Sequence, residues 1–538
     1  MMKNNRIIWL PIALGLAIAL GIFIGTLVST PDQAGRNVFD KSFFSEKSKL
    51  EAILDLIDSE YVEEVNRDSL TEDLIPKLLA NLDPHSVYIP AKDLEMVNED
   101  LEGSFSGIGV QFNIQNDTIM VISVINGGPS SRLGIQPGDR IVMVDDSSFV
   151  GKSITNERVL KTLRGKKGSK VKLGIKRRNS DKLYTYTVTR GDVPLKSVDI
   201  AYRLAPGVGY IKVSSFGAQT YNEFLTAIAK LKYERVSKFV IDLRGNPGGF
   251  LDAAINMVNE FLPEGSLIVY TEGKAFARKD AIADGNGSCQ RAEIVVLIDE
   301  FSASASEIFA GAIQDNDRGL IIGRRSFGKG LVQQQIPFAD SSAVRLTIAR
   351  YYTPSGRSIQ KPYKRGDNNS YEQDILNRYK HGEFSNRDSI KANDSLQYRT
   401  LGGRIVYGGG GITADIFVPK DTLHYTPYLN RVADEGLLYE YAFRYTDTNR
   451  SKLSRYKNWQ DLLAYLQRQP LLNDFTQYAA SRGVKRNSRE ILISAPLLEK
   501  MLYAYIARDS AGDEAFYPIF NLDDPYLKEA LKVLNNKK

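Results

Sequence analysis

The stretch from Ile294 to Gln333 constrains the fold of this chain more than any other. An apolar run, Ile294–Ile298, leads into the small-residue segment Phe301–Glu307, and apolar residues at helical spacing follow it. A second apolar run, Leu320–Gly323, precedes the segment Ser326–Gln333. Strands that alternate with a helix predict an α/β layer, and backbone N–H groups at the start of such a helix can hold an anion.

Ser304 lies at the predicted start of this helix and can act there in two ways. The spacing Ser304-x-x-Glu307 is a capping box, which a helix without any catalytic function uses to begin. A serine exposed at a strand-to-helix turn can instead be a nucleophile, provided that a base takes its proton. The three histidines of the chain are far from this stretch in the sequence; they are His85, His381 and His424.

Lys329 is the candidate base. Phe327, Leu331 and Val332 surround it in the sequence, and burial among apolar groups would lower its pKa from about 10.4 towards neutrality. Lys329 could equally be a loop residue or a phosphate contact. The segment lacks the complete Gly-x-x-x-x-Gly-Lys-Ser/Thr pattern of a phosphate-binding loop.

The run Ser-Ala-Ser-Ala-Ser-Glu, followed by Phe-Gly-Lys-Gly-x-Val-Gln, resembles the carboxyl-terminal processing peptidases, also called tail-specific proteases. The resemblance covers roughly residues 45–420. It implies a serine peptidase with a Ser/Lys dyad, in which Ser304 is the nucleophile and Lys329 the base. That family has a glutamine one helical turn beyond the lysine, so Gln333 would hydrogen-bond and orient Lys329.

The segment Arg244–Gly249 follows another apolar strand and ends in Asn-Pro-Gly-Gly. Glycine after proline is ordinary turn chemistry and needs no function. In the family that the chain resembles, this loop faces the nucleophile and donates a backbone N–H to the oxyanion. By that resemblance Gly248 or Gly249 would act together with the N–H of Ala305. The sequence leaves open which glycine donates.

Residues 98–192 resemble a PDZ domain in the order found in bacterial peptidases, with a glycine-rich hairpin as the alternative. Four residues match the carboxylate-binding loop: Gly107, Ile108, Gly109 and Val110. Their backbone N–H groups would converge on a terminal carboxylate, and the strand that follows would pair with the peptide. Protein substrates would therefore be bound through their C-terminal tails. We also hypothesise that Arg164 contacts the catalytic domain.

Residues Ile7–Val28 are uncharged and mostly apolar, and Lys3 and Arg6 precede them. This length spans a bilayer, and the positive flank keeps the N-terminus in the cytoplasm. We expect an anchor in the inner membrane, with the body of the chain in the periplasm or otherwise outside the cytoplasm. The alternative is a cleaved signal peptide and a secreted protein.

The sequence predicts a multidomain α/β protein. We divide it into a signal anchor (1–29), a tether with N-terminal helices (30–97), the PDZ domain (98–192), a Ser/Lys peptidase domain (193–425) and a helical C-terminal extension (426–538). The peptidase domain is expected to be an α/β sandwich of the crotonase and ClpP type. Polar residues 364–400 predict an insertion or a mobile loop. The N-terminal helices could form a homo-oligomer contact, and the extension could bind an adaptor protein.

Charge and cysteine content exclude several other functions. The net charge of +6 over 538 residues is mild and does not indicate nucleic acid as a partner. The single cysteine, Cys289, rules out an intramolecular disulfide and a cysteine-based metal site. Scattered histidines argue against zinc, so we predict neither a metal nor an organic cofactor.

These observations predict a serine endopeptidase of the cell envelope that captures the C-terminal tails of protein substrates. One alternative is a PDZ-bearing scaffold whose protease domain is inactive, but the three candidate catalytic side chains are all present. Another is a crotonase-like acyl hydrolase, which would not require the carboxylate-binding loop.

Overall fold

The structure, a computed structural model, describes residues 48–115, 117–125, 127–177, 180, 182–391 and 393–536. The chain divides into two compact units, Met1–Ile75 and Pro76–Lys538. The predicted membrane segment, residues 7–28, lies outside the described residues. Within the described ranges, no helix combines the length and the apolar character that crossing a membrane requires.

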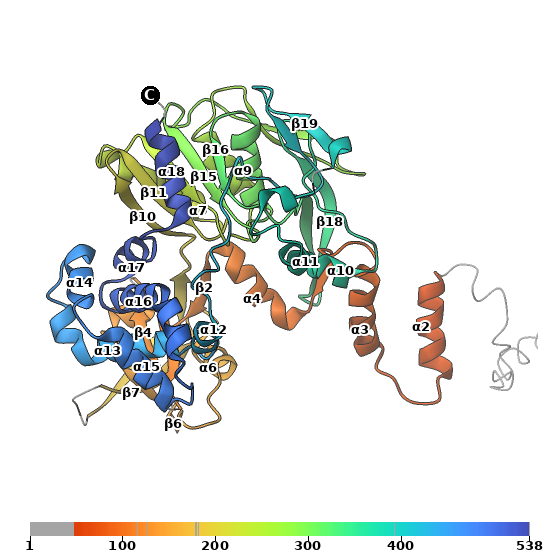
Figure 1. The fold of residues 1–538 in the computed structure, drawn as a ribbon. Helices are drawn as coiled ribbons and strands as arrows, with labels where there is room; N and C mark the ends of the chain where they lie inside the picture. Colours follow the sequence, from red (N-terminus) through yellow and green to blue (C-terminus); the bar gives the residue numbers. More distant parts are fainter. Residues whose placement is uncertain are drawn as a thin grey trace, which may run out of the picture. The chain divides into compact units, whose positions relative to one another are not determined.

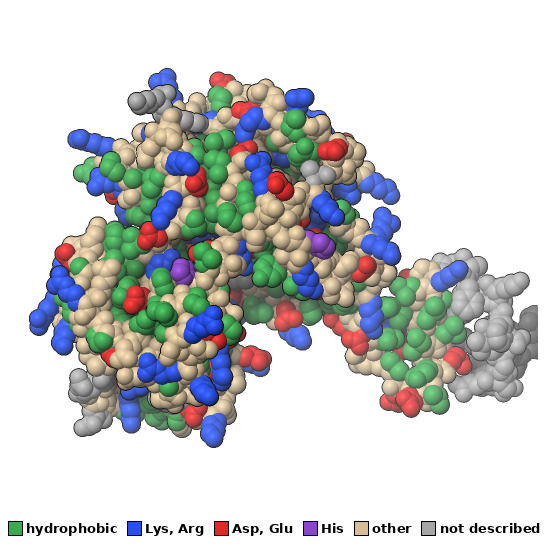
Figure 2. Space-filling model, in the orientation of Figure 1, with side chains coloured by type: hydrophobic (Ala, Val, Ile, Leu, Met, Phe, Trp, Pro, Cys, Tyr) green, Lys and Arg blue, Asp and Glu red, His purple; other side chains and the backbone are tan. Residues whose placement is uncertain are grey.

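The first unit contains α2 (Lys49–Glu60) and the first part of α3 (Arg67–Leu79). Ser48 and Glu51 form a capping box at the start of α2. Several large apolar side chains of this unit are exposed, among them Ile53 and Val62, and Figure 2 shows hydrophobic atoms gathered over these helices. Such a patch suits a protein contact, and the expected homo-oligomer contact stays a prediction.

The predicted PDZ region is an antiparallel sheet in the order β3-β4-β5-β7-β8, with β6 beside β5. Its elements are β3 (Val110–Gln115), β4 (Thr118–Val124), α5 (Pro129–Arg132), β5 (Arg140–Val144), β6 (Ser147–Ser148), α6 (Asn156–Leu163), β7 (Lys170–Lys176) and β8 (Leu183–Thr189). Before it lie β1 (Val87–Ile89) and α4 (Ala91–Glu102), and β2 (Ser104–Gly107) pairs with β9 (Gly191–Pro194). In the described residues β4 is the only strand that pairs with β3, so β3 has an open edge.

The main sheet of the peptidase region has the order β10-β11-β12-β15-β16-β21, and only β10 runs antiparallel to its neighbour. The strands are β10 (Val198–Ala205), β11 (Val208–Val213), β12 (Lys238–Asp242), β15 (Glu293–Ile298), β16 (Leu320–Gly323) and β21 (Ile416–Phe417). The expected strands at 294–298 and 320–323 are therefore confirmed.

Helices cover both faces of this sheet (Figure 1). Alternate residues of each strand face α7 (Thr220–Tyr233), α8 (Leu251–Asn259) and α9 (Ala305–Asp315), where Phe239 and Phe309 share one core. The remaining residues, such as Val240, face α18 (Pro525–Asn536) through Leu527 and Leu534. The last helix of the predicted extension thus completes the core of the peptidase sheet, because it covers apolar side chains that solvent would otherwise reach.

A second sheet lies beside the first and carries part of the site. It has the order β1-β18-β13-β14, with β17 paired to β18. Its further strands are β13 (Leu267–Glu272), β14 (Lys279–Ile282), β17 (Leu331–Pro337) and β18 (Ala343–Tyr352). Strand β1 comes from the segment ahead of the PDZ region, so this early segment is built into the peptidase fold.

The prediction of a mobile loop at 364–400 is wrong for the described residues. The segment forms α10 (Asn368–Glu372), α11 (Asp374–Lys380), two short 3-10 helices and β19 (Gln397–Arg399), which pairs with β20 (Ile405–Tyr407). Arg378 is buried and donates hydrogen bonds to the backbone carbonyls of Arg325 and Ser326. A polar composition is compatible with packing here because backbone carbonyls satisfy the buried guanidinium.

The remaining C-terminal residues form the predicted helical extension, which has a core of its own. Its helices are α12 (Pro427–Asp434), α13 (Leu437–Leu453), α14 (Trp459–Leu466), α15 (Leu471–Ser481), α16 (Ser488–Ala511) and α17 (Asp513–Phe520). Phe443 of α13 is buried against Met120 and Ile122 of β4. The extension therefore follows the peptidase region in the sequence but packs against the PDZ region in space.

Candidate active site

The turn between β15 and α9 places Ser304 in an unusual backbone conformation. Ser304 has a φ of +54°, which is strained for a residue other than glycine. Hydrogen bonds hold the turn: the Ser304 N–H donates to Glu307 Oε2 at 2.9 Å, and the Ala303 N–H donates to the Asn246 carbonyl at 3.0 Å. Neighbouring contacts therefore fix Ser304 where the helix begins.

The three serines of the Ser-Ala-Ser-Ala-Ser run have different surroundings. Ser302 and Ser306 are completely buried, and their hydroxyls donate to the carbonyls of Leu243 and Asn246 respectively. Ser304 instead lines a cavity of about 580 Å³. Of the three, only Ser304 lines this cavity, and its role as the nucleophile stays a prediction.

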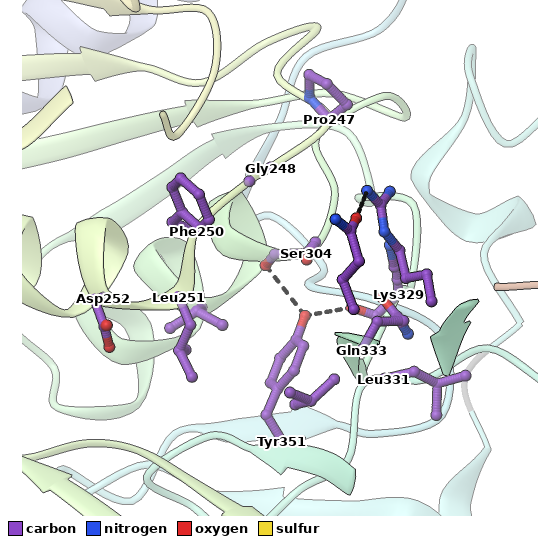
Figure 3. A pocket seen from close by; sticks show the side chains of 15 residues that line it. Pro247, Gly248, Phe250, Leu251, Asp252, Ser304, Lys329, Leu331, Gln333 and Tyr351 are labelled. Carbon is purple, nitrogen blue, oxygen red and sulfur yellow. Dashed lines mark hydrogen bonds between the residues drawn. The ribbon is translucent and has the colours of Figure 1, made fainter. Parts of the chain in front are cut away.

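The same cavity brings together residues predicted from three separate segments (Figure 3). Gly248 and Gly249 line it beside Ser304, Lys329 lines it from the segment that leads into β17, and Gln333 lines it from β17 itself. The Tyr351 hydroxyl joins the two sides, because it contacts the Ser304 carbonyl at 3.1 Å and also the Lys329 carbonyl.

The buried carboxylate of Glu307 connects the serine turn to the lysine turn. It accepts the N–H of Ser304, the N–H of Gly328 at 2.7 Å and the N–H of Lys329 at 2.8 Å, and it also accepts the Ser326 hydroxyl. Burial raises the pKa of Glu307 to about 7, although these hydrogen bonds act in the opposite direction. Glu307 is thus more than the capping partner that its spacing indicated.

Lys329 lies in surroundings that disfavour its charge. Burial lowers the pKa of its ammonium group, and the positive charge of Arg345 lowers this pKa further, whereas Glu307 and Asp83 raise it. Leu331 lines the same cavity, as expected. The Phe327 ring, expected beside Lys329, instead lies 3.9 Å from the ammonium group of Lys361.

Gln333 lies on strand β17, not one helical turn beyond the lysine. It pairs in register with Thr347 of β18, after a bulge at Val332. Its amide nitrogen donates to the Thr347 hydroxyl oxygen at 3.2 Å. The helical spacing is wrong because the chain is extended from Leu331 onwards. The orientation of Lys329 by Gln333 stays a prediction.

Two of the expected oxyanion donors, Gly248 and Ala305, lie close together beside Ser304. Ala305 is the first residue of α9, and within the described residues its N–H has no hydrogen-bond acceptor. Gly248 has a φ of +100°, and a Cβ there would lie 2.7 Å from Ser304 Cβ and 2.9 Å from the Ala305 nitrogen. Only glycine fits this position. The Gly248 N–H already donates to Asn246 Oδ1 at 2.8 Å, so the choice between the two glycines stays open.

The predicted carboxylate-binding loop runs from Gly107 into β3. The Ile108 and Gly109 carbonyls accept the N–H groups of Ser130 at 2.9 Å and Ile125 at 3.0 Å. These bonds turn the carbonyls towards the domain, and Gly109 has a φ of +76°. The Arg164 guanidinium pairs at 2.7 Å with Glu99 of α4, and its hypothesised contact with the catalytic domain stays a prediction.

Comparison with known protein families gives three matches. Residues 207–367 match peptidase family S41, and residues 106–188 match the PDZ domain. Residues 428–512 match a family of unknown function, DUF8443. The extension that covers part of the PDZ region is therefore a recognised domain in its own right.

Two curated relatives are similar over more than half of this chain. The carboxy-terminal processing protease CtpB of Bacillus subtilis is 35% identical over 326 residues, which are 58% of this chain and 65% of that protein. The carboxy-terminal-processing protease of Bartonella bacilliformis is 35% identical over 347 residues, 63% of this chain and 78% of that protein. A solved structure, the photosystem II D1 C-terminal processing protease, is 26% identical, with a TM-score of 0.38, and the match covers 71% of this chain and 90% of that one.

A serine at a strained helix start, a buried lysine in the same cavity and a PDZ domain together define a PDZ-bearing serine peptidase. The relative from Bartonella bacilliformis, which is 35% identical and covered over 78% of its length, shows its family. This chain belongs to the carboxy-terminal processing proteases of peptidase family S41.

We expect the contribution of Glu307 to stability to depend on pH. Because its pKa rises from 4.5 in the unfolded chain to about 7 in the folded chain, the contribution is fully present below pH 4.5. It is lost as the pH rises through about 7, a change of about 3 kcal/mol. Chemical unfolding at several pH values gives the free energy of unfolding of the wild type and of Glu307→Gln, whose amide does not titrate. The change appears as a pH-dependent difference between these two free energies. A difference that stays constant between about pH 5 and about pH 8 would contradict the assignment.

Proposed function

We propose that this chain cuts protein substrates near their C-terminal ends, with Ser304 as nucleophile and Lys329 as general base. One observation carries the proposal: both residues line one cavity while a single carboxylate, that of Glu307, holds the backbone of each. Their relative position is thus built into the fold rather than left to two independent loops.

The chemistry follows from the protonation state of Lys329. Because burial lowers the pKa of its amine, neutral Lys329 can take the proton of Ser304 Oγ while that oxygen attacks the scissile carbonyl. The protonated lysine then gives this proton to the leaving amine. Water, activated by the same amine, hydrolyses the acyl-enzyme. The Ala305 N–H and one glycine N–H would stabilise each oxyanion, typically by about 3 kcal/mol for each donor.

Two other functions compete with this proposal. An inactive scaffold would bind tails without cutting them, and a crotonase-like hydrolase would cleave thioesters instead of peptides. The lowered pKa of Lys329 favours the peptidase, because a scaffold has no need for a buried amine whose charged form is disfavoured. A carboxylate-binding loop ahead of the catalytic domain favours a protein substrate over a thioester.

We expect Ser304→Ala and Lys329→Ala each to lower the degradation of an unstructured polypeptide with an apolar C-terminus by at least about a thousandfold. Each substitution removes one half of the dyad. Lys274→Ala, at an exposed lysine of the same domain, is the matched control and should cut at the wild-type rate. A thermal unfolding midpoint equal to that of the wild type shows that each variant is folded. Substantial cleavage by either dyad variant would exclude the mechanism, and thioester hydrolysis without peptide cleavage would favour the acyl hydrolase.

We further propose that the PDZ domain captures the substrate through its terminal carboxylate. The support is the glycine-containing loop at Gly107–Val110 and the open edge of β3, to which an extended peptide can add as a strand. Backbone pairing supplies affinity without demanding one sequence, so apolar tails of different sequence should bind.

An unstructured polypeptide whose C-terminus is amidated should bind the full-length Ser304→Ala chain at least about tenfold more weakly than the free acid, because the amide loses the charge-assisted hydrogen bonds. Fluorescence anisotropy with the two forms of one peptide measures this ratio. Equal affinities would mean that the loop does not read the carboxylate.

We also propose that the body of the protein lies outside the cytoplasm and is anchored by residues 7–28. This segment of 22 uncharged residues follows Lys3 and Arg6, which favours a cytoplasmic N-terminus. Alkaline phosphatase fused after Lys538 should be active in cells, because that reporter matures only after export. An inactive fusion, together with an active cytoplasmic reporter at the same position, would overturn the topology.

A further inference from the structure

A short segment ahead of the PDZ domain reaches into the catalytic sheet. Strand β1 pairs antiparallel with β18, with Val87 opposite Arg345 and Ile89 opposite Ala343. Just before this strand, Asp83 is buried, with 6% of its surface exposed. A buried carboxylate needs hydrogen-bond donors, and one donor to Asp83 is Thr347 of β18, which in turn contacts Gln333 in the active-site cavity.

Asp83 first fixes its own turn. Its Oδ1 accepts the N–H groups of His85 at 2.9 Å and Ser86 at 3.0 Å, and its Oδ2 accepts the Ser86 hydroxyl at 2.6 Å. The same Oδ1 accepts the hydroxyl of Thr347 on β18 at 3.0 Å. The Thr347 N–H donates to Ser86 Oγ at 3.1 Å, so the turn and the strand are joined at two points.

The bond to Asp83 determines how Thr347 meets Gln333. A threonine hydroxyl has one proton, and an ionised carboxylate can only accept, so that proton points at Asp83. Thr347 Oγ1 therefore offers a lone pair to the Gln333 amide nitrogen, which lies 3.2 Å away. With its nitrogen engaged on this side, the Gln333 amide leaves its carbonyl oxygen as the group free to accept a proton donor. Gln333 lines the same cavity as Lys329.

We propose that Asp83 and Thr347 are positioning residues of the peptidase, which orient Gln333 so that its carbonyl oxygen accepts a hydrogen bond from the ammonium group of Lys329. The inference rests on the proposed Ser304 and Lys329 mechanism. The bond forms when Lys329 has taken the proton of Ser304, and it is lost when that proton passes to the leaving amine. A reversed amide would instead present its NH₂ group, which cannot accept from an ammonium.

Thr347→Val removes the hydroxyl but keeps the β-branched shape of the strand residue. We expect kcat to fall about tenfold with KM unchanged, since one orienting hydrogen bond is lost and no substrate contact changes. Thr347→Ser keeps the hydroxyl and should cut at close to the wild-type rate. A valine variant as active as the wild type, or a serine variant as impaired as the valine variant, would overturn the proposal.

A double-mutant cycle tests whether Thr347 acts through Gln333. In the Gln333→Ala background, Thr347→Val should lower kcat less than about twofold further, because there is no amide left to orient. Independent, additive losses would show that Thr347 supports the strand rather than Gln333. Both experiments use the full-length protein and an unstructured polypeptide with an apolar C-terminus.

Asp83→Asn tests the role of Asp83 through the pH dependence of kcat/KM, which a purely structural role would leave unchanged. The charged groups around Lys329 are Arg345, Glu307 and Asp83, and His85 is neutral at working pH because burial and Lys329 lower its pKa to about 4. Removing the negative charge of Asp83 takes away one influence that raises the pKa of Lys329. The rise of kcat/KM with pH should therefore shift to lower pH, together with a lower maximum.

The control for this shift is Asp73→Asn, which changes an exposed aspartate outside the turn and should leave the pH profile unchanged. An unshifted profile in Asp83→Asn with unchanged activity would contradict the proposed role of Asp83. The inference and the peptidase mechanism fail in different ways: cleavage by Ser304→Ala would end the mechanism, whereas an active Thr347→Val would end only the positioning role.

Discussion

The structure of the active site depends on one buried carboxylate. Glu307 lies at the end of the first turn of α9 and accepts N–H groups from the serine turn before it and from the lysine turn that leads into β17. The two oxygens of one carboxyl group can accept several hydrogen bonds at once, and burial makes each of these bonds stronger than it would be in water. The strained φ of Ser304 is held by these bonds. A cap that many helices use for stability is here also the contact that joins the backbone of Ser304, the proposed nucleophile, to that of Lys329, the proposed base.

The third side of the site, the Asn-Pro-Gly-Gly loop, is held from two directions. Asn246 accepts the N–H of Ala303 and the hydroxyl of Ser306, so this loop and the serine turn form one framework. At the start of the loop, Arg244 binds Asp242 at the end of β12 and Asp524 just ahead of α18. Burial alone would raise the pKa of Asp242, but the positive charges of Arg244 and Lys212 hold it below its usual range. The segment just ahead of α18 thus helps to hold the Asn-Pro-Gly-Gly loop, which is the proposed oxyanion loop, through the Arg244–Asp524 ion pair.

Much of the fold could be predicted from apolar runs, because β12, β15 and α9 are buried along almost their whole length. The site could be predicted only in part. The spacing around Ser304 could not separate a nucleophile from a capping serine, and the resemblance to a peptidase family made that choice. The resemblance implied that Gln333 lies one helical turn beyond Lys329, but Gln333 is instead extended and pairs with β18. Roles that depend on contacts between distant segments were missed, since nothing near Asp83 in the sequence indicates that it reaches Thr347.

The central claim is that an uncharged Lys329 activates Ser304 within one prearranged cavity. The most direct measurement is the rate at which a fluorophosphonate modifies the full-length protein as a function of pH, with the adduct located by mass spectrometry. The account predicts an adduct on Ser304 whose rate rises through a pKa below the ordinary lysine value of 10.5, and whose formation is lost in Lys329→Ala. An adduct on another residue, or equal rates in the wild type and Lys329→Ala, would contradict it.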